Sequence, residues 1–193
     1  DRTSRGLGDV YKRQIDQRII ELRKPDIRAA ILAEDDVEGS GLLIEGLGGL
    51  TAGMLDQVFV LGDPPDYEPT PDRSIVGLAE RNGVTANEAA FDAFCAEDGR
   101  ALLMLPLYNY VEHNHDVIRE QLTHPTAVSG LADGGAHCGF ICDASVPTTM
   151  ISHWTRDRSR GEQLPLEWVV KKQTADTAAL FGLGDRGTIE VGK

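Results

Sequence analysis

The chain has 193 residues, of which 41% are hydrophobic and 26% are charged, the composition of an ordinary globular domain. Its formal net charge is −12, so we expect no nucleic-acid partner, because no basic surface could neutralise phosphates. No apolar run is long enough to span a bilayer, and no membrane partner is expected. The odd count of three cysteines predicts free thiols in a reducing, cytoplasmic compartment.

The first 14 residues differ in character from the rest. Asp9-Val-Tyr-Lys-Arg-Gln14 resembles the translation of a transposon end used in preparing sequencing libraries, and residues 1–8 carry no periodic apolar pattern. A genuine basic arm is the alternative. We expect residues 1–14 to be non-native, and the natural sequence to begin near Ile15, inside a longer gene.

The first half of the chain is expected to be mainly helical, with one short strand. The expected elements are a helix over 16–34 interrupted at Pro25, a loop over 35–53, a buried strand over 57–61, a proline-rich connector over 64–71, a helix over 74–81, and a helix that follows Thr85. Thr85 and Glu88 have the spacing of a capping box, in which each side chain satisfies the other's backbone N–H group.

The second half predicts an α/β fold. The apolar run over 101–107 fits a strand buried on both faces, as in a parallel sheet. A helix over 114–122 and an apolar strand over 126–131 follow, and this order predicts a βαβ unit with parallel strands. Further helices are expected near Thr148, from Pro165 (with a buried stripe of Leu166, Val169 and Val170) and over 176–181, where Gly182 ends the helix; a strand begins at 187.

The candidate site follows the second of these strands, in Leu131-Ala-Asp-Gly-Gly-Ala-His137. Barrels of alternating strands and helices place catalytic carboxylates at the carboxyl ends of their strands, so Asp133 is the predicted catalytic residue. Gly134 would let the backbone approach a substrate, and His137 and Asn109 lie just past strand ends. We predict that Asn109, Gly134 and His137 contact substrate. Turn formation by Asp133 and Gly134, and a structural hydrogen bond by His137, are the alternatives.

The segment over 130–145, continued in His153-Trp-Thr-Arg-Asp-Arg158, resembles the D-aminoacylase branch of the metal-dependent amidohydrolases. The similarity extends from about Ile15 to Lys193. Its other well-matched pieces are Asp66-Tyr-Glu-Pro69, Leu105-Pro-Leu-Tyr-Asn-Tyr110, Leu122-Thr-His-Pro125 and Thr174-Ala-Asp-Thr-Ala-Ala-Leu-Phe-Gly-Leu183.

The resemblance implies hydrolysis of small-molecule N-acyl-D-amino acids on one or two zinc ions in a (β/α)8 TIM barrel. Residues 15–183 would be the C-terminal part of the barrel, with 33–100 inserted between strands six and seven. Residues 184–193 would begin the return strand to a small β-sandwich. Asp133 matches the aspartate that ligates metal or acts as general acid and base. The other ligands belong to earlier strands, so this chain alone is expected to be inactive.

Other polar residues are given structural roles. We predict that His113 and His115 lie at the surface, and that Arg156, Asp157, Arg158 and Arg160 form a solvated helix end. Cys138 and Cys142 are expected to pack rather than bind metal. Two other functions stay open, a cyclic amidohydrolase of the dihydropyrimidinase or dihydroorotase kind and a non-catalytic barrel scaffold, and so does the oligomeric state.

Overall fold

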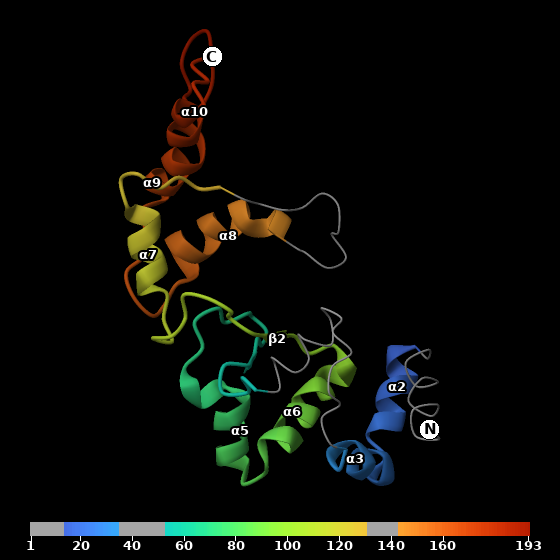
Figure 1. The fold of residues 1–193 in the computed structure, drawn as a ribbon. Coiled ribbons are helices and arrows are strands. Elements are labelled where there is room, and N and C mark those ends of the chain that lie inside the picture. Colours follow the sequence, from blue (N-terminus) through green and yellow to red (C-terminus); the bar gives the residue numbers. More distant parts are fainter. Residues whose placement is uncertain (1–13, 35–52, 131–142) are drawn as a thin grey trace. The chain divides into compact units, whose positions relative to one another are not determined.

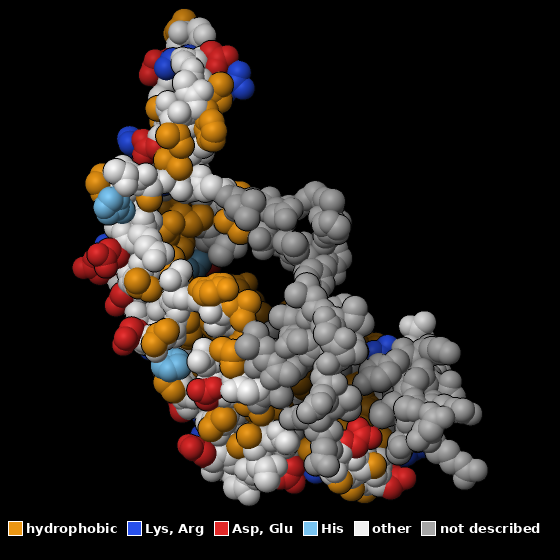
Figure 2. Space-filling view, viewed as in Figure 1, with side chains coloured by type: hydrophobic (Ala, Val, Ile, Leu, Met, Phe, Trp, Pro, Cys, Tyr) orange, Lys and Arg blue, Asp and Glu red, His pale blue; other side chains and the backbone are white. Residues whose placement is uncertain are grey.

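The computed structural model describes residues 14–34, 53–130 and 143–193 (Figure 1). The chain divides into two compact units, Asp1–His113 and Asn114–Lys193. No helix within the described ranges is long and apolar enough to cross a membrane. Acidic side chains are spread over the visible surface of each unit, and basic ones are scattered among them (Figure 2).

Two short helices open the first unit, α2 (Ile15–Leu22) and α3 (Pro25–Leu32). The predicted interruption at Pro25 is confirmed. Lys24 is extended, as the residue before a proline prefers, and Pro25 occupies the first helical position, where its missing N–H group costs no hydrogen bond. Arg28 of α3 lies between Glu88 and Asp92, with nitrogen–oxygen distances of 3.7 and 3.2 Å.

The sheet of the first unit has two strands, β1 (Phe59–Val60) and β2 (Leu103–Met104), which pair antiparallel. Both are shorter than predicted. The predicted βαβ unit is not found, because β2 pairs with the earlier strand β1 and no strand forms over 126–130. A parallel sheet requires cover on both faces, whereas Leu102 and Leu107, at the two ends of the apolar run, are 67% and 50% exposed.

Two helices pack beside these strands, α5 (Ile75–Asn82) and α6 (Ala86–Phe94). The short 3-10 helices η1 (Pro71–Arg73) and η2 (Ala96–Gly99) flank them. The core of the unit contains one buried side chain from before β1 together with residues of both helices: Val58, Ile75, Ala79, Ala89 and Ala93. Both predicted helices are therefore confirmed, and side chains of the strands pack against the cluster that the helices form.

Local capping explains where α5 and α6 begin. The Ser74 hydroxyl accepts a hydrogen bond from the Gly77 backbone N–H at 3.1 Å. The capping box is confirmed: the Glu88 carboxylate accepts from the Thr85 backbone N–H at 2.9 Å, and the Thr85 hydroxyl accepts from the Glu88 N–H at 3.2 Å. These bonds satisfy N–H groups that the first helical turn leaves without partners.

All regular elements among the described residues of the second unit are helices. Its elements are α7 (Asp116–Thr123), the 3-10 helix η3 (Asp143–Ser145), α8 (Val146–Ser152), the π-helix η4 (His153–Asp157), α9 (Leu166–Lys171), the π-helix η5 (Lys172–Asp176) and α10 (Thr177–Leu180). Met150, Trp154, Leu164 and Val169 form its core, and Ile118 and Leu122 of α7 pack against them. The helices predicted at 114–122, near Thr148 and after Pro165 are confirmed.

The C-terminal segment differs from the prediction in two places. Val169 is fully buried, but Leu166 and Val170 are 51% and 43% exposed, so the buried stripe of α9 is narrower than expected. The strand predicted from 187 is absent, because a strand needs a neighbour for its backbone hydrogen bonds and none of the described segments pairs with it. Gly182 does end α10, with φ +67° and the Leu183 N–H donating to Ala178 O at 2.9 Å.

Candidate functional site

The predicted site is described only in part. Asp133, Gly134 and His137 lie outside the described residues, and so do Cys138 and Cys142. Asn109 is exposed, with φ +60°, a left-handed conformation that asparagine adopts more readily than most residues. Its substrate contact stays a prediction, and the backbone bends at this residue.

His113 is half-buried, so the predicted surface position is wrong. Its ring meets the rings of Phe59 and Tyr110 edge-on, with centroid distances of 6.3 and 5.9 Å. The Tyr110 hydroxyl donates to Pro69 O at 2.8 Å, which fixes that ring in the core. Aromatic rings favour this edge-to-face arrangement, and the partner Phe59 is far away in sequence, which is why local pattern did not reveal it.

The second unit brings two histidines together. His115 is the N-cap residue of α7, and His153 is the first residue of η4. His115 Nδ1 lies 3.5 Å from His153 Nε2, and the ring centroids are 5.5 Å apart. His153 is buried and His115 half-buried, so the surface position predicted for His115 is also wrong.

The Trp154 ring packs against both histidine rings. Its centroid lies 5.3 Å from that of the His153 ring and 6.1 Å from that of the His115 ring. Trp154 is 5% exposed and belongs to the core of the unit. The histidine rings are therefore held by a large buried neighbour, which limits their rotation.

Arg158 is the polar centre of the same unit. Its side chain is fully buried and donates to Asp116 Oδ1 at 2.6 Å and to Glu162 O at 2.8 Å. The predicted solvated helix end is wrong for this residue and right for the neighbouring exposed pair of Arg156 and Asp157. Arg158 buries its charge because an anionic partner and a carbonyl group satisfy the guanidinium.

A glycine in the loop after η4 makes room for Arg158. Gly161 has φ +124°, and a Cβ atom built on it would lie 2.5 Å from Arg158 Nη2. The chain thus needs glycine here for both backbone conformation and space. No local pattern in the sequence marks Arg158 as buried, because its partner Asp116 lies far away along the chain.

A buried carboxylate in the first unit was also missed. Glu68 is 3% exposed, and its backbone N–H donates to Asp66 Oδ1 at 3.0 Å. Asp66 in turn forms an ion pair with Arg73. Glu68 stands in the Asp66-Tyr-Glu-Pro69 piece that carried the resemblance, and its position between prolines marked it only as a connector.

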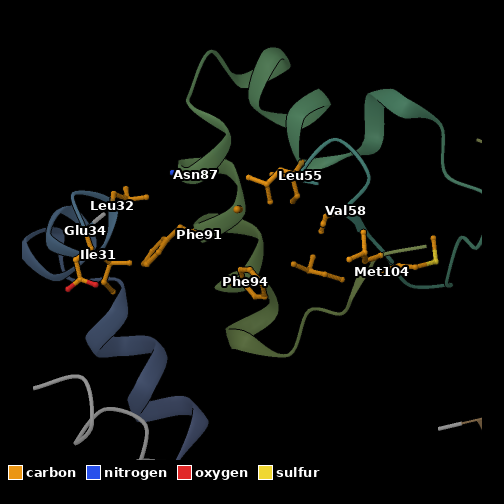
Figure 3. Close-up of a pocket in the computed structure, with 13 residues that line it drawn as sticks. Ile31, Leu32, Glu34, Leu55, Val58, Asn87, Phe91, Phe94 and Met104 are labelled. Atoms are coloured by element: carbon orange, nitrogen blue, oxygen red, sulfur yellow. The ribbon is translucent and has the colours of Figure 1, made fainter. Parts of the chain in front are cut away.

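The first unit contains an apolar cavity of about 460 Å³. Figure 3 shows side chains of α3 on one side, α6 in the middle, and residues of β2 and of the segment before β1 on the other: Ile31, Leu32, Phe91, Phe94, Met104, Leu55 and Val58. Glu34 and Asn87 are its polar lining residues. The described lining has one carboxylate and no histidine or cysteine, so the cavity can hold an apolar group but has no acid–base pair.

The chain matches the model of the amidohydrolase family over residues 2–193, and it belongs to that family. No curated protein and no solved structure matches it. Membership makes the protein a hydrolase, and the family implies a TIM-barrel-type fold and a bound metal ion. The described residues form helices and one two-stranded sheet, so they do not themselves outline a barrel.

Proposed function

We propose that the chain is the C-terminal part of a zinc-dependent enzyme that hydrolyses the amide bond of N-acyl-D-amino acids. The family match over residues 2–193 supports a hydrolase, and the sequence around Asp133 carries the finer assignment. That sequence continues through Cys142-Asp-Ala-Ser145 to His153-Trp154, which separates it from the cyclic amidohydrolases.

The chemistry requires a carboxylate at position 133. An amide is a poor electrophile, and an amine is a poor leaving group. A bound zinc ion would act as a Lewis acid that polarises the amide carbonyl, and it would lower the pKa of a water bound to it toward about 7. Asp133 either holds the ion or works beside it, where its carboxylate accepts a proton from the attacking water and donates it to the departing nitrogen. Carboxylate and imidazole are ligands that zinc accepts, and the Asp133 to His137 segment offers both.

The predicted substrate contacts are part of this proposal. Gly134 gives the backbone close access to the acyl group, and His137 and Asn109 offer side-chain hydrogen bonds. The full enzyme would gain its remaining metal ligands from segments upstream of Ile15. We propose that the 193-residue chain alone releases no amino acid from these substrates.

The test is an assay of the gene product that extends upstream of this chain. We expect release of the free amino acid from N-acetyl-D-amino acids, with weaker release from the L-enantiomers and dependence on zinc. Asp133→Asn should lower kcat about 10²- to 10⁴-fold, the range for loss of a general acid–base group. Asp157→Asn is the matched control, because Asp157 is an exposed partner of Arg156 and should leave kcat unchanged.

Three outcomes would contradict the proposal. Hydrolysis of dihydropyrimidines or dihydroorotate in place of acyl-D-amino acids would favour the cyclic amidohydrolases. Absence of both bound metal and hydrolysis in the complete protein would favour a scaffold. Activity in the 193-residue chain would show that the missing ligands are not needed.

A further inference from the structure

The facing histidines His115 and His153 are not used by the proposed reaction. The nitrogen atoms of the pair lie 3.5 Å apart, about 2 Å closer than the 5.5 Å between the ring centroids. The two rings therefore point their nitrogen atoms toward one another, rather than stacking their faces. His115 is brought there by the start of α7 and His153 by the end of α8.

The nitrogen–nitrogen distance is long for a hydrogen bond. Such bonds usually have donor–acceptor distances of about 2.7–3.2 Å, so a separation of 3.5 Å is at the outer limit. Two imidazole nitrogens on one tetrahedral zinc ion, each about 2.0–2.1 Å from the metal, lie about 3.4 Å apart. The observed separation fits two ligands of one ion better than it fits a direct hydrogen bond.

The surroundings hold both rings in this position. Trp154 contacts both imidazoles, and Arg158 lies over Trp154 with Cζ 4.9 Å from the indole centroid. His153 also begins a π-helix, and π-helical turns are frequent at functional sites. Ligands held by packing lose little conformational freedom on binding, which favours affinity.

We propose that His115 and His153 bind one divalent transition-metal ion of the zinc class, with water or another ligand in the remaining positions. Neutral imidazole suits Zn²⁺, Ni²⁺ and Cu²⁺. The site goes beyond the proposed function, because neither residue matches a position that the resemblance assigns to the catalytic zinc. Binding requires unprotonated imidazoles and therefore weakens at acid pH, since a protonated ring nitrogen has no lone pair for the metal.

The test uses the 193-residue chain with Zn²⁺, measured by calorimetry, and with Co²⁺, whose visible spectrum reports nitrogen coordination. We expect one ion per chain at this site. His115→Gln and His153→Gln should each weaken Zn²⁺ binding at least about tenfold. Loss of a residue that only hydrogen-bonds to a metal ligand already lowers metal affinity about 10- to 100-fold, and loss of a ligand should cost no less. His124→Gln is the matched control, because His124 is an exposed turn residue bonded to Thr126.

Asp133→Asn separates this proposal from the proposed function. The variant should bind Zn²⁺ at the histidine pair as tightly as the unaltered chain, whether or not the complete enzyme loses activity. Loss of binding in Asp133→Asn, with binding retained in both histidine variants, would overturn the proposal. Far-UV circular dichroism shows whether each variant folds.

Ring resonances of the unaltered chain give a result that needs no variant. Zn²⁺ should shift the imidazole C–H signals of His115 and His153 together, and leave those of His124 unchanged. A shift of other histidines, with His115 and His153 unchanged, would also overturn the proposal.

Discussion

The guanidinium group of Arg158 lies over the indole ring of Trp154, with Cζ 4.9 Å from the ring centroid. The same group is fully buried, and its partner Asp116 is 69% exposed at the side chain. One charge of the pair is thus inside the second unit, and the other is at its surface. The Trp154 ring contacts the rings of His115 and His153 as well as the Arg158 guanidinium.

Replacing Arg158 by methionine should destabilise the protein by about 2–3 kcal/mol. The change removes a desolvated contact with the Trp154 ring and the hydrogen bonds to Asp116 and to Glu162 O. Urea unfolding at neutral pH measures the loss. Arg156→Met is the control, because Arg156 pairs with Asp157 at the exposed surface and should not change the unfolding midpoint. Equal effects of the two substitutions would contradict the buried role.

Gly161→Ala should destabilise the protein by more than about 1 kcal/mol. The new Cβ atom would lie 2.5 Å from Arg158 Nη2 and 2.8 Å from Arg158 Cζ, and the φ of +124° is unfavourable for alanine. Gly184→Ala is the matched control, since a Cβ there meets no atom within 4 Å. Thermal unfolding of both variants tests the difference, and a Gly161→Ala protein as stable as Gly184→Ala would count against the geometry.

The capping box of α6 should make stability depend on pH. The Thr85 backbone N–H and hydroxyl donate to Glu88, and these bonds hold the pKa of Glu88 below its ordinary value of 4.5. A carboxyl group with a lowered pKa stabilises the fold above the unfolded value, and this contribution is lost as pH falls through the folded value. An NMR titration of Glu88 should therefore give a pKa below 4.5.

Thr85→Ala tests the same capping box by removing its hydroxyl group. Loss of a threonine cap costs about 1 kcal/mol at neutral pH. The variant should also move the pKa of Glu88 back toward 4.5, because the hydroxyl donor is gone and the backbone bond is weakened. The stability difference between the variant and the parent should shrink at low pH. A difference that stays constant from pH 7 to pH 3 would be inconsistent with the box.

Lys172→Met should loosen the turn that follows α7. Lys172 is 5% exposed, lies over the Trp168 ring at 5.3 Å, and donates to the carbonyl groups of His124 and Ala127. Losing the buried donor to these partly buried carbonyl groups should cost about 1 kcal/mol and speed amide hydrogen exchange over 124–127. Lys171→Met, at an exposed residue, should leave that exchange unchanged. Similar exchange in both variants would show that Lys172 does not hold the turn.

Helix ends could be predicted because their causes are local. Pro25, the Thr85 and Glu88 pair, and Gly182 each act on backbone groups within a few residues, and all three predictions are confirmed. The apolar run over 101–107 led to a wrong prediction of a parallel strand, because an apolar sequence indicates burial but does not indicate which strand will pair with it. Its central residues pair antiparallel with β1, and its ends are exposed.

The sequence by itself determined the helix boundaries and membership of the amidohydrolase family, since caps, prolines and motif residues act over short spans of chain. Only the tertiary structure decided that Arg158 is buried, that His113 packs on Phe59, and that His115 faces His153. Charged and imidazole side chains are ordinarily solvated, and they enter a core only where distant segments supply their partners. Those partners have no fixed spacing along the chain, so no local pattern could reveal them.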